Sequence, residues 1–474
     1  MSWLSAIRTR WIAPVLASAA LALTLALPAP ASAQSIIRDT EIEGIIREWS
    51  DPVFVAMGLN PEDVELLLVN DASLNAFATR GRIMGVNTGL ILRTQSPNQL
   101  LGVIAHEAGH IKNRHTLRDG AQAAGAQPFW MSMALGALAI AAGAPDAGAA
   151  LISSSQFFGT IGALKYMQAQ EGEADVSALR ALDRAGESGR GLVEFFENFR
   201  SQEVFSEARR YPYFRSHPLS SQRIEALRRP AEASAHYSSA DSPERMAQHA
   251  LVLAKIHGFM DHPNAVFREY PETDDSLPAR YARAIAWYRD GQTDRALTAV
   301  DALMEGDPQN PYLWELRGQI LFEEGRPTEA IGAHQRAVEL KPDAPLLRVN
   351  LAHALLESGD ADNLDAAVDQ LKRAAAMEND NTMAWRLLGQ AYDRQGKEGE
   401  ARLASAEMYF AARNSQQATQ FALRARDLLP QNSAEYRRAL DIVFASGATQ
   451  DDLDDLERRQ QRRNNNTPEF RPVP

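Results

Sequence analysis

His106, Glu107 and His110 form a His-Glu-x-x-His segment, the part of this sequence best suited to chemistry. On an α-helix, residues four apart lie about 40° apart in projection, so the two imidazoles leave one face together. Two imidazoles placed in this way can hold one Zn²⁺ ion, and Glu107 can reach a water at that metal. The segment therefore predicts a metal-dependent hydrolytic site.

A second acidic segment, Glu171-Gly172-Glu173-Ala174-Asp175, follows further along the chain. Glu171 and Asp175 have helical i, i+4 spacing, and we expect Glu171 to be the third zinc ligand, with the fourth position open to water. Asp175, one turn on, is placed to accept the free N–H of a ligating histidine and to fix its tautomer. Glu173 points elsewhere on the helix, and we expect it to be solvated.

Glu107 is the predicted general base. It would take a proton from the water that attacks a peptide carbonyl and hand that proton to the leaving amine. The competing interpretation is a surface helix whose two histidines fall four apart by chance. The sequence has no cysteine, which excludes disulfides and thiol catalysis and leaves histidine and carboxylate groups as zinc ligands.

Length and composition limit the number of domains and the kind of partner. A chain of 474 residues is too long for one core and predicts two or three domains, and 45% hydrophobic residues are ample to pack them. The formal net charge of −12 gives no basic footprint, so we expect no nucleic-acid partner.

The helix that carries the two histidines has clear start signals. Ser96 suits the N-cap, Pro97 suits the first helical position, and Gln99 completes a capping box. Gly102 and Gly109 each cost about 1 kcal/mol of helix propensity. They lie on one face, and we expect them to let another backbone approach closely.

The region before this helix predicts a helix and a small sheet. Residues 39–49 have apolar side chains at i, i+3, i+4 and i+7 spacing, which indicates an amphipathic helix. Residues 64–69 read as a strand, and residues 76–78 and 85–89 as two more short extended segments.

The N-terminus is typical of a cleaved export signal. Arg8 and Arg10 precede an apolar stretch, residues 12–27, and Ala31-Ser32-Ala33 is a small-residue cleavage site. We expect the mature chain to start near Gln34 in a Gram-negative periplasm, with a retained membrane anchor as the alternative. The largely uncharged region 129–164 is a further candidate for membrane contact. Its apolar part is short for a span of about 20 residues, so it predicts a buried helical hairpin or a lid over the site.

The C-terminal half has internal repeats. Ala296 and Ala330 lie 34 residues apart, as do Pro308 and Pro342. This period, with small residues where helices touch and proline after the second helix, indicates tetratricopeptide repeats, which stack into a superhelix with a partner-binding concave face. The fold class we predict is mainly α: an N-terminal α+β zinc-metalloprotease domain, helical with a small β-sheet, followed by an α-α superhelix. The predicted bounds are a signal peptide at 1–33, a metallopeptidase domain at 34–235, a helical connector at 236–278, a repeat domain at 279–448 and a disordered tail at 449–474.

The two motifs together resemble those of the zinc metalloproteases related to the CAAX prenyl protease and the bacterial heat-shock membrane protease. The resemblance implies a substrate-binding edge strand that contains Asn75 and Asn87. It also implies that His217 is a regulatory residue that closes the fourth zinc position until it moves. Arg223 would stabilise an oxyanion or pair with a carboxylate. His115 matches a family position as well, and we expect it to be structural or to contact a ligand.

The resemblance and the repeats together imply an exported zinc endopeptidase in protein quality control. Its substrates would be misfolded or stalled outer-membrane proteins, and its repeats would dock to the outer-membrane β-barrel assembly machinery. Peripheral contact with a membrane fits this role. The alternatives are a repeat-based periplasmic chaperone or scaffold with little proteolysis, and an integral membrane protease that uses region 129–164.

Overall fold

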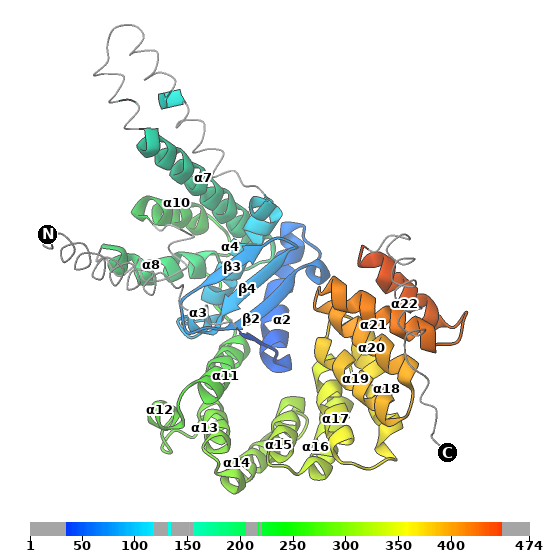
Figure 1. Ribbon diagram of the computed structural model, residues 1–474. Helices are drawn as coiled ribbons and strands as arrows, with labels where there is room; N and C mark the ends of the chain where they lie inside the picture. The colour runs from blue at the N-terminus through cyan, green and yellow to red at the C-terminus, as the bar shows by residue number, and fades with distance from the viewer. Residues whose placement is uncertain are drawn as a thin grey trace, which may run out of the picture.

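The computed structural model describes an N-terminal half that holds the sheet and a stack of helices that curves beneath it (Figure 1). The described residues are 35–117, 131–133, 151, 155–204, 217 and 220–447. The predicted leader, the cleavage site, most of the uncharged region 129–164 and the predicted tail lie outside them. The predicted fold class, mainly α with one small sheet, is confirmed.

The sheet has four short strands in the order β1-β2-β4-β3. The strands are β1 (Ser35–Ile37), β2 (Glu65–Asn70), β3 (Ala76–Thr79) and β4 (Ile83–Asn87). β2 pairs parallel with β4, while β1 and β3 pair antiparallel with their neighbours and form the two edges. Gly85 is required in β4, because a Cβ there would lie 2.3 Å from the Phe77 ring.

Helix α2 (Thr40–Met57) runs further than the residues 39–49 predicted. The Asp39 side chain caps its first turn, and Gly58, at φ 80°, ends it. The apolar face continues past Trp49 through Val53 and Phe54, which are fully buried, so packing extends the helix through its internal proline. The 3₁₀ turn η1 (Pro61–Asp63) then leads into β2.

Helix α4 (Pro97–Lys112) carries the His-Glu-x-x-His segment and begins where the sequence predicts, after the short helix α3 (Thr88–Ile91). The Ser96 hydroxyl accepts the Gln99 N–H, and the Gln99 side chain accepts the N–H of Gln95 rather than that of Ser96. A Cβ at position 102 would meet Leu192 of α8 (Arg190–Val204), and one at position 109 would meet Ala174 of α7 (Ser155–Arg184). The two glycines thus allow two different helices, α8 at Gly102 and α7 at Gly109, to pack closely against α4.

Two helices link this half to the repeats. α10 (Ser221–Glu232) continues through Pro230, because Leu227 and Ala231 on either side of it still pack in the N-terminal core. α11 (Pro243–Met260) adds Val252 and Ile256 to the same core, although it lies in the predicted connector. Among the described residues, no helix is long and apolar enough to cross a membrane.

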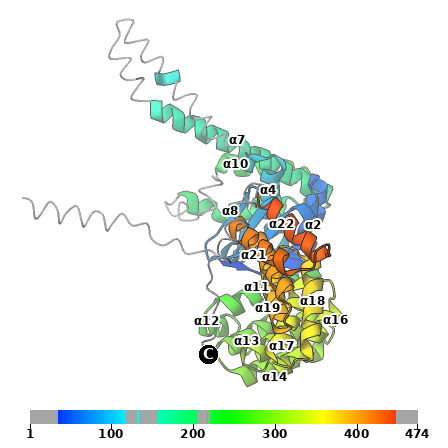
Figure 2. The same cartoon turned by 45° about the vertical axis from the view of Figure 1, so that its right-hand side comes forward.

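The repeats form a curved stack of antiparallel helices, seen from a second side in Figure 2. Alanines are buried at many of the helix contacts, as the repeat pattern requires. The helices are α12 (Pro263–Glu269), α13 (Leu277–Arg289), α14 (Thr293–Gly306), α15 (Pro311–Glu323), α16 (Pro327–Leu340), α17 (Pro345–Glu357), α18 (Asn363–Met377), α19 (Thr382–Arg394), α20 (Glu398–Ala411), α21 (Ser415–Leu428) and α22 (Ala434–Ala445).

Ion pairs hold the start of α2 against α11, and a hydrogen bond holds it against the repeat helix α13. Lys255 of α11 contacts Asp39 at 2.8 Å and Glu41 at 2.9 Å, and the Tyr281 hydroxyl donates to Glu41 at 2.8 Å. Burial alone would lower the pKa of Lys255, but these carboxylates raise it well above its usual value. Lys255 is therefore a charged ammonium group paired with the start of α2, and Tyr281 of α13 extends these contacts to the repeat half.

The close approach at Gly109 predicts a stability difference between two glycine substitutions. Gly109→Ala places a Cβ 2.7 Å from the Ala174 carbonyl oxygen, and overpacking of this kind costs about 1–3 kcal/mol. Gly172→Ala is the matched control, because a Cβ there meets nothing within 4 Å and helix propensity improves by up to about 1 kcal/mol. The free energy of unfolding, measured in urea, should be lower than that of the wild type in Gly109→Ala and higher in Gly172→Ala. Equal changes in the two variants would contradict this packing.

Buried His249 of α11 predicts acid sensitivity. Its Nε2 lies 2.8 Å from the Thr94 hydroxyl, and burial lowers its pKa from 6.5 to about 4. The folded protein then binds fewer protons here than the unfolded chain, so stability is lost as the pH falls from 6.5 toward 4. At pH 5 the loss is about 2 kcal/mol. The urea midpoint of His249→Phe should fall less between pH 7 and pH 5 than that of the wild type, and equal falls would contradict the assignment.

Candidate metal centre

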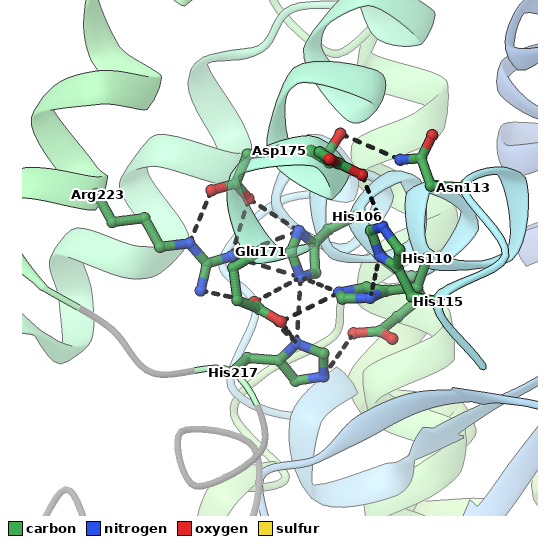
Figure 3. A network of polar contacts seen from close by, with 10 residues as sticks. His106, His110, Asn113, His115, Glu171, Asp175, His217 and Arg223 are labelled. Carbon is green, nitrogen blue, oxygen red and sulfur yellow. Dashed lines mark hydrogen bonds and ion pairs between the residues drawn. The ribbon is translucent and has the colours of Figure 1, made fainter. Parts of the chain in front are cut away.

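Four buried side chains converge where α4 faces α7. His106, His110, Glu171 and His217 each offer a ligand atom, and these atoms all lie within 4.8 Å of one another. Figure 3 shows the two α4 imidazoles, the α7 carboxylate and His217, which precedes α10, pointing toward one another. The structure therefore brings together the three predicted ligands and the predicted fourth one.

The distances fit a single small cation better than a set of hydrogen bonds. The Nε2 atoms of His106 and His110 are 3.2 Å apart, and His217 Nδ1 lies 3.2 Å from His106 Nε2. The two carboxylate oxygens of Glu171 contact one α4 imidazole each: Oε2 lies 3.3 Å from His106 Nε2, and Oε1 lies 3.3 Å from His110 Nε2. Three imidazole nitrogens and one carboxylate oxygen are a donor set that suits zinc.

The electrostatics of the metal-free cluster favour cation binding. Burial would raise the pKa of Glu171, but hydrogen bonds with the three histidines hold it well below its usual range. Burial lowers the pKa of His110. Burial also opposes protonation of His106, yet Asp175 and Glu171 outweigh it and raise its pKa to about 9. A metal that binds here must displace that proton.

Asp175 lies where the sequence predicts an orienting group. Its Oδ1 is 2.8 Å from His106 Nδ1, which holds a proton on Nδ1 and aims Nε2 of that ring at the cluster. Burial would raise the pKa of Asp175, but Arg223 and His106 hold it below its usual value. The carboxylate is thus ionised and able to accept the imidazole N–H.

Arg223 lies against the carboxylates of the site, which is one of the two roles that the resemblance implies for it. The guanidinium contacts Asp175 at 2.7 and 2.8 Å and Glu171 at 2.9 Å, so it pairs with two carboxylates. It also stacks over the Phe196 ring at 4.8 Å. The Ser220 hydroxyl caps α10 by accepting the Arg223 N–H, which fixes where this side chain starts.

Glu107 stands beside the cluster and fits a catalytic base. Its side chain is fully buried, and neither carboxylate oxygen has a hydrogen-bond partner among the described residues. His217 Nε2 is its nearest ionic neighbour, at 3.5 Å. Burying a carboxylate without hydrogen bonds is costly, so such a group fits a site whose chemistry involves a cation and a reacting water.

His115 lies on the outer side of His110, so it contacts one of the predicted ligands, and its link to Glu173 is the contact that sequence reasoning missed. His115 Nδ1 lies 3.1 Å from His110 Nδ1, and His115 Nε2 lies 3.1 Å from a Glu173 carboxylate oxygen. The Glu173 side chain is 61% exposed, so it is solvated as predicted but is not without a role. The sequence signal for these contacts is a histidine just past the end of α4, the helix that carries His106 and His110.

The predicted edge strand needs correction. Asn87 ends β4, an inner strand, and its fully buried side chain donates to the Ser73 hydroxyl at 3.0 Å. The edge is β3, and Asn75 immediately precedes it, with its carbonyl accepting the Asn87 N–H. Local patterns show that segments are extended but not their order in the sheet, and the prediction for Asn87 was wrong for that reason.

Comparisons with known proteins agree with this geometry. Residues 37–231 match peptidase family M48, and residues 293–436 match the TPR domain of cytochrome c-type biogenesis protein H. The metalloprotease YcaL of Escherichia coli is 30% identical over 174 residues, 36% of this chain and 63% of that protein. The chain is therefore a metallopeptidase with an M48 domain joined to a TPR domain.

Several relatives match over most of the chain, among them the following two. A putative beta-barrel assembly-enhancing protease of Vibrio cholerae is 24% identical over 415 residues, 85% of this chain and 84% of that protein. The beta-barrel assembly-enhancing protease of Escherichia coli is 26% identical over 354 residues, 74% of this chain and 72% of that protein. The resemblance on which the sequence analysis relied is confirmed.

Proposed function

We propose that this chain is an exported zinc metalloendopeptidase of protein quality control. It hydrolyses peptide bonds in misfolded or stalled outer-membrane proteins, and its repeats dock to the outer-membrane β-barrel assembly machinery. The single observation that carries the proposal is the buried cluster of His106, His110 and Glu171 beside Glu107, whose carboxylate accepts no hydrogen bond from the described residues. The names of the two long relatives, both beta-barrel assembly-enhancing proteases, support a protease role in β-barrel assembly.

In the proposed mechanism, His106, His110 and Glu171 hold the zinc, which supplies a Lewis acid for the peptide carbonyl. Glu107 takes a proton from the attacking water and passes it to the leaving amine. Asp175 keeps the His106 ring in one tautomer, and Arg223 pairs with both Asp175 and Glu171 and helps to keep Asp175 ionised. The buried setting strengthens each of these electrostatic contacts.

Substrate backbone would bind by strand addition at β3. This strand is an edge of the sheet and contacts the metal helix α4, so a peptide paired with it would lie near the cluster. Asn75 precedes that edge, and Asn87, now assigned to the inner strand, has no part in this binding.

His217 would hold the resting enzyme closed. Its Nδ1 is 3.0 Å from Glu171 and its Nε2 is 3.5 Å from Glu107, so one ring takes the fourth metal position and also lies against the base. Water and substrate would reach the metal only after His217 moves. This closed arrangement also favours the second candidate function, a repeat-based chaperone or scaffold with little proteolysis.

Glu107→Gln separates these two functions. The substitution keeps the size of the side chain but removes the base, so zinc content should be unchanged while cleavage of a misfolded outer-membrane protein falls about 10²–10⁴-fold. Glu62→Gln, at an exposed acidic position, is the matched control and should retain full activity. Unchanged degradation by the Glu107→Gln variant would sink the protease proposal and leave the scaffold.

His217→Ala tests the closed state. If the resting enzyme is open about one-tenth of the time, removal of the imidazole should raise the initial cleavage rate about tenfold, because the competent state is no longer the minor one. His236→Ala, a histidine substitution outside the cluster, should leave the rate unchanged. A rate equal to or below that of the wild type would assign His217 a catalytic or structural role instead.

A further inference from the structure

The outer nitrogen of His110 contacts a second histidine rather than a carboxylate. His106 contacts Asp175 directly, at 2.8 Å, whereas His110 reaches Glu173 only through His115. The His110 and His115 rings meet edge to face, with centroids 5.0 Å apart and an interplanar angle of 73°. The His115 side chain is only 3% exposed, so water does not replace either contact.

The backbone is bent to make this contact. Helix α4 ends at Lys112, and the next turn contains Arg114 at φ 57°, a left-handed conformation that side chains other than glycine rarely adopt. That turn delivers His115, the first residue of η2 (His115–Leu117), to the outer side of His110. Strain of this kind persists where surrounding contacts hold it in place.

A second contact fixes the same turn to α7. The side-chain amide of Asn113 donates to the Glu173 carbonyl at 3.2 Å and to the Ser177 hydroxyl at 3.0 Å. The end of α4 and the segment of α7 that carries Glu173 are thus held together by groups other than His115. The backbone at Glu173 is therefore held beside this turn by a contact that does not involve His115.

Only one arrangement of protons is consistent with the contacts that join His110, His115 and Glu173. His110 directs Nε2 at the cluster, and a nitrogen that binds a metal must offer a lone pair, so its Nδ1 carries the proton. His115 Nδ1 must then accept that proton's hydrogen bond, which leaves His115 Nε2 to donate to Glu173. A carboxylate at the end of the path is an acceptor only, so it fixes both tautomers in turn.

We propose that His115, anchored by Glu173, is a positioning residue that fixes the tautomer and ring orientation of His110 and so sets the affinity of the metal site. This inference rests on the proposed function, in which His106, His110 and Glu171 hold zinc. His115 touches neither the metal nor the substrate. It acts through His110, in the way that Asp175 acts through His106.

The test compares the zinc affinity of purified full-length variants by competition with a chelator. Loss of a group that orients a metal ligand weakens binding about 10–100-fold, and we expect His115→Phe to fall in that range. Glu173→Gln should weaken binding by a smaller factor and does not endanger the fold, because the side chain is mostly exposed. Glu232→Gln, at an exposed position on α10, is the matched control and should bind zinc like the wild type.

Two further measurements separate positioning from a structural role. The ¹⁵N shifts of the metal-free wild type should show His115 protonated at Nε2 and unprotonated at Nδ1, and the opposite tautomer would overturn the inference. The thermal midpoint of metal-free Glu173→Gln should equal that of the wild type while its zinc affinity falls. Wild-type zinc affinity in both His115→Phe and Glu173→Gln would also overturn it. A wild-type chain that binds no zinc would instead overturn the proposed function.

Discussion

The approach of α4 to α7 at Gly109 is the constraint on which the metal centre depends. With no side chain at that position, the backbone of Ala174 packs directly against the metal helix. Glu171 and Asp175, one helical turn apart on α7, then both meet α4: the first faces the imidazole Nε2 atoms and the second faces the outer nitrogen of His106. A larger residue at position 109 would move both carboxylates away together.

Much of the candidate centre was predictable because it follows helical periodicity. Spacing alone placed His106 and His110 on one face and paired Glu171 with Asp175, and the N-cap at Ser96 fixed where the metal helix begins. His217 was reached through family resemblance, since no local pattern says where a residue outside the metal helices will lie. Strand order is set by long-range pairing, so the sequence could not show that Asn87 lies on an inner strand.

The repeats were likewise predictable from a local pattern, whereas the contacts between α2, α11 and the repeat half were not. A 34-residue period predicts stacked helix pairs, and the repeat half forms them. Nothing local in Asp39, Glu41 or Lys255 shows that they meet, because more than 200 positions separate the lysine from its partners. A buried ammonium group that loses one carboxylate partner is strongly destabilised, so these contacts help to fix how the two halves are arranged.

The central claim is that His217 completes the zinc coordination of the resting enzyme, and zinc X-ray absorption tests it most directly. In the wild type, the account predicts four protein ligands: three imidazole nitrogens and one carboxylate oxygen, at about 2.0–2.2 Å. The spectrum of His217→Ala should show one imidazole fewer. A wild-type spectrum with only two imidazoles and a water in the fourth position would contradict the account.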